Sequence, residues 1–242
     1  MSVRRVLALV ATVAAASAVA MSVPTVAATA APRSPQAFVV SEAQFNQIFP
    51  NRNKFYTYQG LTKALGSWQA FATSGDDKTK KREAAAFLAN VGHETGDLKY
   101  IEELNQSAWG SYCDTSKSYG CPAGNTAYHG RGPLQLSWNY NYKAAGDALG
   151  IDLLHDPGKV SKDSTVAWQA GGLWFWMTQS GAGSMTAHDA MAKNKGFGET
   201  IRTINGALEC GGKNHDQMQD RVNRYQKYVK ILGADAGGNL SC

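Results

Sequence analysis

Two glutamates, Glu94 and Glu103, have side chains and a spacing in the sequence that could support catalysis. They lie in the stretch HETGDLKYIEE, directly after an alanine-rich amphipathic run. A pair of carboxylates is the minimal apparatus for cleaving a glycosidic bond, because one donates a proton to the leaving oxygen and the other activates a water. Glu94 would be the general acid and Glu103 the general base. The alternative is a helix-end acid in a salt bridge and an ordinary surface charge.

A helix predicted over residues 82–96 would position Glu94. Phe87, Val91 and Glu94 follow one another at i, i+4 and i+7, so they share one helix face. Glu94 then lies near the helix C-terminus, where the helix dipole and partial burial both favour a protonated carboxyl. Glu103 lies beyond the helix in a polar segment, and such a wetter setting suits a base that stays ionised.

Residues 128–142, YHGRGPLQLSWNYNY, form a second segment that could bind a substrate. Aromatic side chains alternate there with amide, hydroxyl and glycine residues. Sugars bind through aromatic faces and through polar groups that match their own hydroxyls. An extended conformation of LQLSW would put Gln135 and Ser137 on one face. The alternative is a structural turn with core aromatics.

Residues 203–210, TINGALEC, place Asn205 and Glu209 four residues apart at a predicted helix end, and Arg221 follows in the next predicted helix. An arginine that pairs with Glu209 near a catalytic acid could adjust the proton affinity of that acid. The alternative is an ordinary structural salt bridge.

The N-terminus predicts export. A basic start, MSVRR, precedes the apolar stretch LALVATVAAASAVAM, so residues 1–30 read as a signal peptide with cleavage near 28–30. A membrane anchor is the alternative, but the stretch is short and rich in alanine. Residues 31–38 would be a short flexible lead-in and residues 39–242 one domain. We expect a secreted, extracellular protein with no membrane contact after cleavage.

Charge and composition exclude several classes of protein. The chain has 24 basic and 19 acidic residues, and loss of Arg4 and Arg5 with the signal leaves 22 against 19, a net charge of +3. That charge is far from a nucleic-acid signature, so no nucleic-acid partner is expected. The histidines are scattered, no CxxC is present, and HET lacks the second histidine of HExxH. We therefore expect neither a metal nor another cofactor.

Four cysteines in an exported chain predict two disulfides. Three pairings are possible, and we favour the nearest-neighbour pairing, in which Cys113 joins Cys121 and Cys210 joins Cys242. Strand signals are weak, so the fold class is mainly α. The predicted helices cover residues 41–49, 60–73, 82–96, 139–149, 164–179, 198–205 and 216–232.

Four segments, FLANVGHETG, YHGRGPLQLSWNYNY, LWFWMT and INGALECG, together resemble glycoside hydrolase family 19 chitinases of the compact bacterial type. The resemblance runs from about residue 38 to residue 242. It implies a mainly α, two-lobed, lysozyme-like fold with a substrate cleft. It also implies a monomeric endochitinase that hydrolyses β-1,4 bonds of chitin and chitooligosaccharides with inversion, and that needs no cofactor.

The resemblance also implies roles by motif position. Glu94 matches the general acid, Glu103 matches the general base, and Ser137 would hold the attacking water. The family's cysteine spacings match the favoured disulfides. Substrate-binding positions correspond to Gln135, Tyr140, Asn141 and Asn205, and positions around the acid correspond to His93, Glu209 and Arg221.

Three positions depart from the pattern or leave it open. His129 stands where the family usually has an aromatic residue. Asp97 stands where glycine is common, and would add negative charge near Glu94. Glu102 precedes Glu103, and a loop register shifted by one residue would make Glu102 the base.

Two rival functions follow from the same features. A peptidoglycan hydrolase would act on a polymer that shares the N-acetylglucosamine unit. A non-catalytic, wall-binding antifungal protein would keep the cleft without the chemistry. The joint presence of Glu94, Glu103 and Ser137 argues against a dead cleft, whereas only substrate tests separate chitin from peptidoglycan.

Overall fold

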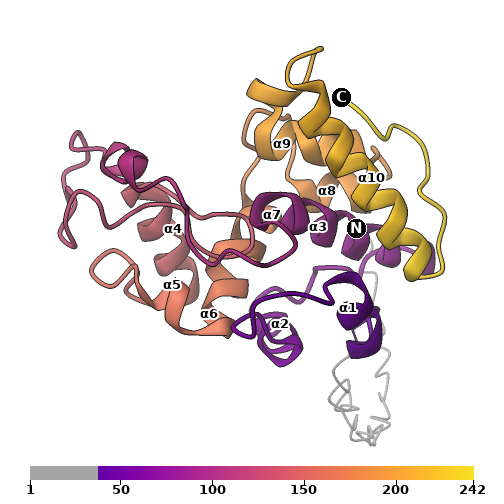
Figure 1. Ribbon diagram of the computed structural model, residues 1–242, viewed down its shortest axis with the longest axis horizontal. Helices are drawn as coiled ribbons and strands as arrows, with labels where there is room; N and C mark the ends of the chain where they lie inside the picture. Colours follow the sequence, from indigo (N-terminus) through magenta and orange to yellow (C-terminus); the bar gives the residue numbers. More distant parts are fainter. Residues whose placement is uncertain (1–37) are drawn as a thin grey trace, which may run out of the picture. The chain divides into compact units, whose positions relative to one another are not determined.

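A computed structural model describes residues 38–242, which form a helical unit (Figure 1). The predicted signal peptide and the lead-in up to residue 37 lie outside the described residues. Within residues 38–242 no strand forms, and the only β pairing is two isolated bridges, Glu102 with Arg131 and Arg131 with Leu136. The predicted mainly α fold is confirmed.

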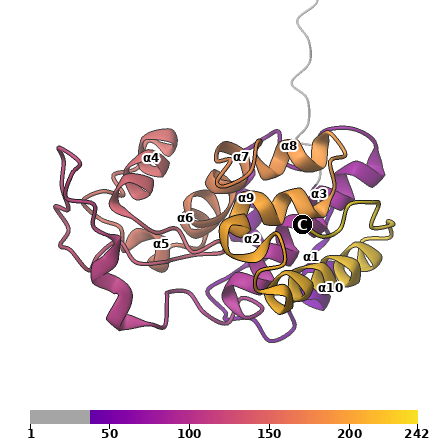
Figure 2. The same ribbon diagram turned by 90° about the horizontal axis from the view of Figure 1, so that it is seen from above.

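Two lobes divide these residues, because they bury two separate apolar clusters. Figures 1 and 2 show α4 and α5 at one end and α8, α9 and α10 at the other. The larger lobe contains α1 (Glu42–Ile48), α2 (Tyr58–Ala64), α3 (Asp77–Thr95), α8 (Ala187–Ala192), α9 (Phe197–Glu209) and α10 (His215–Ile231). The smaller lobe contains the 3-10 helix η1 (Gln106–Tyr112), α4 (Asn139–Leu149) and α5 (Lys159–Lys162).

A continuous helical run joins the lobes. It consists of α6 (Ser164–Trp168), the π-helical turn η2 (Gln169–Trp174) and α7 (Phe175–Thr178). Trp168 and Trp176 enter the larger apolar cluster, whereas Ala170 and Trp174 enter the smaller one. The run therefore contributes side chains to both apolar cores and connects the two lobes.

The central helix of the larger lobe is α3. It begins at the N-cap Asp76, whose carboxylate accepts from the Thr79 backbone N at 2.8 Å, and it ends at Gly96 with φ +57°. Its alanines are buried, and α10 packs along it. The prediction of a helix over 82–96 is confirmed, although the helix starts five residues earlier because its first turns are capped and charged.

Other predicted helices differ from the structure in three places. The helix expected over 60–73 stops at Ala64, and turns follow it, with Ala72 at φ +51°. The run expected as one helix over 164–179 contains the π-helical turn at its paired glycines. The helix expected over 198–205 extends to Glu209 through a kink at Asn205, where φ is −142°. Helices α5, α8 and η1 were not predicted, because each is short.

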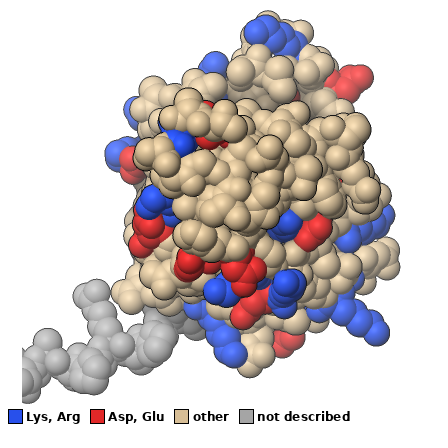
Figure 3. Space-filling model, turned by 90° about the vertical axis from the view of Figure 1, so that its left-hand side faces the viewer, with Lys and Arg blue, Asp and Glu red and all other residues tan. Residues whose placement is uncertain are grey.

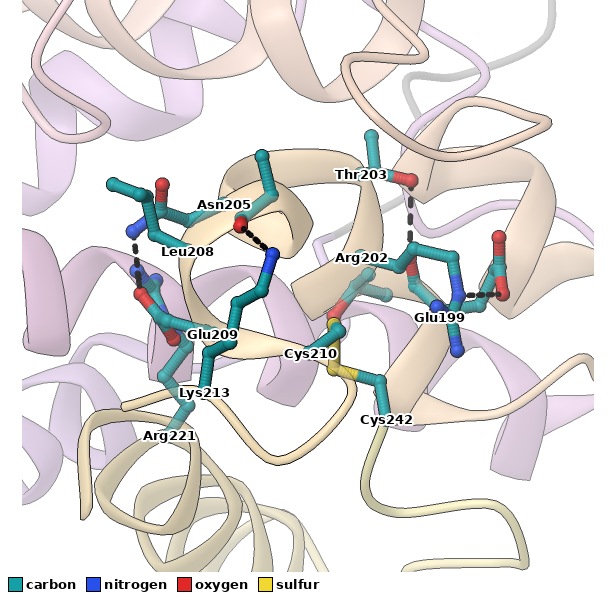
Figure 4. Close-up of a disulfide and its surroundings, with 12 residues drawn as sticks. Glu199, Arg202, Thr203, Asn205, Leu208, Glu209, Cys210, Lys213, Arg221 and Cys242 are labelled. Carbon is teal, nitrogen blue, oxygen red and sulfur yellow. Dashed lines mark hydrogen bonds and ion pairs between the residues drawn. A yellow bond between two sulfur atoms is a disulfide. The ribbon is translucent and has the colours of Figure 1, made fainter. Parts of the chain in front are cut away.

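The two favoured disulfides are present. Cys113–Cys121 closes a loop of the smaller lobe, and Cys210–Cys242 ties the C-terminal segment to the end of α9 (Figure 4). In residues 38–242 no helix is long and apolar enough to cross a membrane.

Candidate active site

Two adjoining hollows between the lobes share the lining residues Glu94, Gln135 and Ser137. The larger has a volume of about 400 Å³ and also contains Tyr100, Glu102, Glu103, Leu104, Asn105, Tyr112 and Gly130. The smaller has a volume of about 220 Å³ and also contains Leu134, Leu136, Trp138, Asn141, Ala170, Gly171, Phe175, Ile204 and Asn205. The structure thus brings Glu94, Glu103 and Ser137 to one cleft.

Glu94 lies in the last turn of α3 and is 22% exposed. Arg221 of α10 donates from Nη2 to Glu94 Oε1. The same guanidinium donates to both carboxylate oxygens of Glu209 at 2.8 Å, and Figure 4 shows Arg221 beside Glu209. It also donates to Asn90 Oδ1 at 3.1 Å. The salt bridge considered as the alternative for Glu94 is present, and it lies in the cleft. The expected grouping of Glu209 and Arg221 around Glu94 is also present.

Charge in this group is shared unevenly. Burial opposes ionisation of Glu209, but the hydrogen bonds and charge of Arg221 outweigh burial and lower the pKa of Glu209. Burial opposes the charged form of Arg221 as well, yet the two carboxylates raise its pKa. One guanidinium, that of Arg221, therefore faces the two carboxylates of Glu94 and Glu209.

Asn205 supports Glu209 from the kink in α9. Its Nδ2 donates to Glu209 Oε1 at 2.6 Å, and the residue lines the smaller hollow (Figure 4). A predicted substrate-binding residue is thus also a hydrogen-bond partner of the group around Glu94.

His93 and Asp97, at the end of α3, contact a second group of side chains, which lies on α10. His93 Nδ1 lies 2.7 Å from Asp220 Oδ2, which also accepts from Arg224 Nε at 2.7 Å. Asp97 accepts from Arg224 and from the Tyr228 hydroxyl. The expectation that Asp97 adds negative charge beside Glu94 is therefore wrong, because Arg224 neutralises it.

Glu103 lines the larger hollow, and one of its carboxylate oxygens has no hydrogen-bond partner. Oε1 accepts from the Tyr112 hydroxyl at 3.0 Å, whereas Oε2 is buried and unpartnered. The predicted wetter setting is only partly correct, since Oε2 is buried. A buried acceptor without a partner is costly, so Oε2 is suited to bind a water or a substrate hydroxyl.

Glu102 differs from Glu103 because both of its oxygens are occupied. Arg131 Nε donates to Oε1 at 3.1 Å, and His129 Nε2 lies 3.3 Å from Oε2. Burial opposes ionisation of Glu102, but the nearby Ser161 side chain, the charge of Arg131 and the contacts with His129 and Arg131 outweigh burial, so the pKa of Glu102 is lowered. Of the two neighbours, Glu103 has the carboxylate oxygen free for chemistry.

Gln135 and Ser137 share the cleft, but not through an extended segment. Gln135 has φ +52°, and residues 131–136 form a tight turn closed by two hydrogen bonds between Arg131 and Leu136 at 3.1 and 2.9 Å. The expected extended conformation is wrong, because Gly132 at φ +78° begins a turn that reverses the chain. Ser137 Oγ donates to the Gln135 carbonyl at 2.8 Å.

The two remaining predicted substrate-binding residues behave differently. Asn141 lines the smaller hollow and donates to the Ser137 carbonyl at 3.0 Å. Tyr140 stacks on Trp138 with ring centroids 5.5 Å apart, and it lines neither hollow. Sequence reasoning missed Tyr112 as a partner of Glu103; its place beside Cys113 was the available signal.

Within the described part of the chain, no group of three or more His, Cys, Asp or Glu side chains could hold a metal ion. The site consists of carboxylates, an arginine and hydroxyl and amide groups, in a cleft between two helical lobes. That combination defines the class of lysozyme-like glycoside hydrolases.

The family described as chitinase class I matches residues 39–242, and the chain belongs to this family, the glycoside hydrolase family 19 chitinases. Endochitinase B of Zea mays is 48% identical over 189 residues, which are 78% of this chain and 63% of the maize protein. The chain thus spans less than two thirds of that relative. Chitinase 5 of Oryza sativa subsp. japonica is 46% identical over 211 residues, 84% of this chain and 69% of the rice protein.

Solved structures agree with the fold. Chitinase C from Streptomyces griseus HUT6037 is 64% identical with a TM-score of 0.83, over 85% of this chain and 81% of that chain. A class IV chitinase from Zea mays is 43% identical with a TM-score of 0.75, over 86% of this chain and all of that chain. The expected lysozyme-like fold of the family is confirmed.

Proposed function

We propose that this protein is a secreted endochitinase that hydrolyses β-1,4 bonds in chitin and chitooligosaccharides with inversion. The observation that carries the proposal is the larger hollow, which is lined by Glu94, Glu103 and Ser137 together. Family membership and the names of the relatives, chitinases and endochitinases, supply the substrate class.

The proposed reaction is a single displacement. Glu94 gives its proton to the glycosidic oxygen as the bond from that oxygen to the anomeric carbon breaks. Glu103 Oε2 removes a proton from a water, whose oxygen forms the new bond to the anomeric carbon from the opposite face. Ser137 helps to hold that water. Arg221 then stabilises the Glu94 carboxylate left behind.

Substrate binding is assigned to the polar residues that line the hollows. Gln135, Asn141 and Asn205 offer amide groups that can pair with sugar hydroxyls and acetamido groups. Tyr140 would act at the edge of the cleft. The outer end of the smaller lobe, seen in Figure 3, carries its charged side chains mainly around an uncharged centre.

Export is supported by two observations. The first 30 residues have the composition of a signal peptide, and all four cysteines are paired in disulfides. A chain of this kind would act outside the cell as a monomer.

A product assay tests the proposed function. Purified protein is incubated with N-acetylglucosamine hexamer and with purified peptidoglycan, beside a Glu94→Gln control. Shorter N-acetylglucosamine oligomers from the hexamer alone support a chitinase. Cleavage of peptidoglycan alone would assign the rival hydrolase, and binding without cleavage of either would assign a wall-binding protein.

The stereochemistry is tested separately by NMR of a fresh digest, before mutarotation. Inversion of a β-linked substrate releases the α-anomer first. An initial excess of β-anomer would mean retention, and would contradict the roles given to Glu103 and Ser137.

A further inference from the structure

Beside Glu103 lies a buried ionic cluster that the proposed reaction does not use. We call Glu102, His129 and Arg131 the Glu102 cluster. Glu102 accepts from Arg131 and faces His129, whose side chain is 3% exposed, while that of Arg131 is 8% exposed. Arg131 Nη1 also donates to the Ala127 carbonyl at 2.7 Å and to the Tyr142 hydroxyl at 2.8 Å. Charges are buried at this level only when each of them is paired.

The His129 ring is held at both of its nitrogens and on one of its faces. Nδ1 lies 2.9 Å from the Thr126 carbonyl, and Nε2 lies 3.3 Å from Glu102 Oε2. Arg131 Nη2 is a longer contact, 3.5 Å from Nδ1. The ring stacks on Trp109, with centroids 3.6 Å apart and planes 7° apart. His129 therefore links Glu102 to Trp109.

Contacts from this cluster lead directly to the main chain of Glu103. The Glu103 backbone N donates at 2.9 Å to the carbonyl of Gly130, the residue between His129 and Arg131. On the other edge, Trp109 Nε1 donates to the Glu103 carbonyl at 3.3 Å. The backbone of Glu103 is therefore held from both sides by residues that the cluster fixes.

We propose that the Glu102 cluster positions Glu103, so that Glu102 and His129 are positioning residues of the reaction and not spare acids or bases. The inference rests on the proposed function, in which Glu103 is the base. Glu102 joins the segment 101–103 to the segment 129–131, and His129 holds Trp109 against Glu103. The carboxylate of Glu103 is then held in place at the larger hollow, and a small displacement of a base costs a large factor in rate.

Kinetics on N-acetylglucosamine hexamer test the proposal with Glu102→Gln and His129→Ala. Glu102→Gln keeps the size of the side chain but removes its charge, and His129→Ala removes both the stack on Trp109 and the contact with Glu102. We expect kcat to fall by about tenfold to a hundredfold in each, with KM within about twofold of wild type, since the substrate contacts remain. Asp147→Asn and His155→Ala, both on exposed residues of the same lobe, are the matched controls and should keep the wild-type kcat.

Double variants separate positioning from direct catalysis. If Glu102 acts only through Glu103, adding Glu102→Gln to Glu103→Gln should lower kcat no further. Glu102→Gln with kcat within about twofold of wild type, or losses that multiply in the double variant, would overturn the positioning role. A Glu103→Gln enzyme that stays active beside an inactive Glu102→Gln would instead make Glu102 the base, and would contradict the proposed function as well.

Discussion

Arg221 is the residue on which the charge around Glu94 depends. Its side chain is 1% exposed, and it joins Glu94 to Glu209 across the α3–α10 contact. In a site of this kind, a nearby cation lowers the cost of leaving the acid ionised after it has donated its proton. The unoccupied oxygen of Glu103 gives the opposite carboxylate a different setting. The two roles proposed for these glutamates thus rest on their different partners and not on the residue type.

Replacement of the acid is the first prediction at this scale. Glu94→Gln removes the proton donor, so kcat on N-acetylglucosamine hexamer should fall by about 10² to 10⁴, while binding measured by calorimetry persists. Ser137→Ala should cost less, because Ser137 only helps to hold a water. Glu42→Gln, on the exposed first turn of α1, is the control. Retention of more than a tenth of the wild-type kcat in Glu94→Gln would contradict the acid assignment.

A buried carboxylate joins two elements, α3 and α8. Glu83 of α3 is fully buried; Oε1 lies 2.7 Å from His188 Nδ1 of α8 and accepts from Trp176 Nε1 at 3.1 Å. Oε2 accepts from the Ala72 backbone N at 3.0 Å. The pKa of His188 is raised, chiefly by the hydrogen bond to Glu83, which outweighs its burial. This pair links α8 to the central helix.

The pH dependence of stability should follow from this pair. Because the folded pKa of His188 exceeds its unfolded value, the proton stabilises the folded state. That contribution is complete below about pH 6.5 and is lost as the pH rises through the folded pKa. In urea unfolding from about pH 6 to 9, wild type should lose more stability than His188→Gln. His155→Gln, on an exposed histidine, should follow wild type; equal slopes for all three would refute the prediction.

The π-helical turn η2 packs tightly against the rest of the protein at Gly171. A Cβ on Gly171 would meet the Arg131 carbonyl at 2.8 Å and Gly132 Cα at 2.9 Å. The Gly171 carbonyl accepts from the Leu134 backbone N at 2.6 Å, so η2 and the turn of residues 131–136 are in direct backbone contact. This contact supports the turn that carries Gln135 into the cleft.

Gly171→Ala should therefore separate η2 from that turn. We expect a loss of about 1 to 3 kcal/mol in the free energy of unfolding, as for other overpacked sites, together with a lower kcat/KM. Gly110→Ala is the control, since nothing lies within 4 Å of a Cβ there. Urea titration and hexamer kinetics measure both effects; wild-type values in Gly171→Ala would show that the contact has room for a methyl group.

On the scale of the whole molecule, the C-terminal segment is fastened at several points. Asp235 pairs with Lys78 and with Arg82 of α3, and the Asn239 carbonyl accepts from the Gly198 backbone N at 2.8 Å. Cys242 closes the segment onto Cys210, which follows Glu209 directly (Figure 4). The last ten residues thus cover α9 and α3.

The two disulfides should differ in their effect on stability. Cys210–Cys242 spans 32 residues of sequence and Cys113–Cys121 spans 8. By loop entropy the first should contribute about 3 to 4 kcal/mol and the second about 2 to 3 kcal/mol. The paired Cys→Ser variants, compared by urea unfolding at one pH, measure this order. A larger loss on removing Cys113–Cys121 would contradict the entropic account.

Several features of this protein could be predicted from the periodicity and capping signals of its sequence. The apolar spacing before Glu94 predicted the helix that carries it, and four cysteines in a chain predicted to be exported predicted two disulfides. Motif order gave the family and the mainly α fold. These features depend on neighbours within a few residues or on long matched segments, so they can be read from the chain alone.

Tertiary packing decided which charges meet. Arg221 lies 127 residues after Glu94, and although the sequence suggested a pair with Glu209 near the acid, only the packing of α10 on α3 shows that one guanidinium contacts both carboxylates. Packing also pairs Asp97 with Arg224 and gives both carboxylate oxygens of Glu102 a partner. It leaves one carboxylate oxygen of Glu103 without a hydrogen-bond partner. Electrostatic partners depend on distance in space and on burial, which a sequence does not contain.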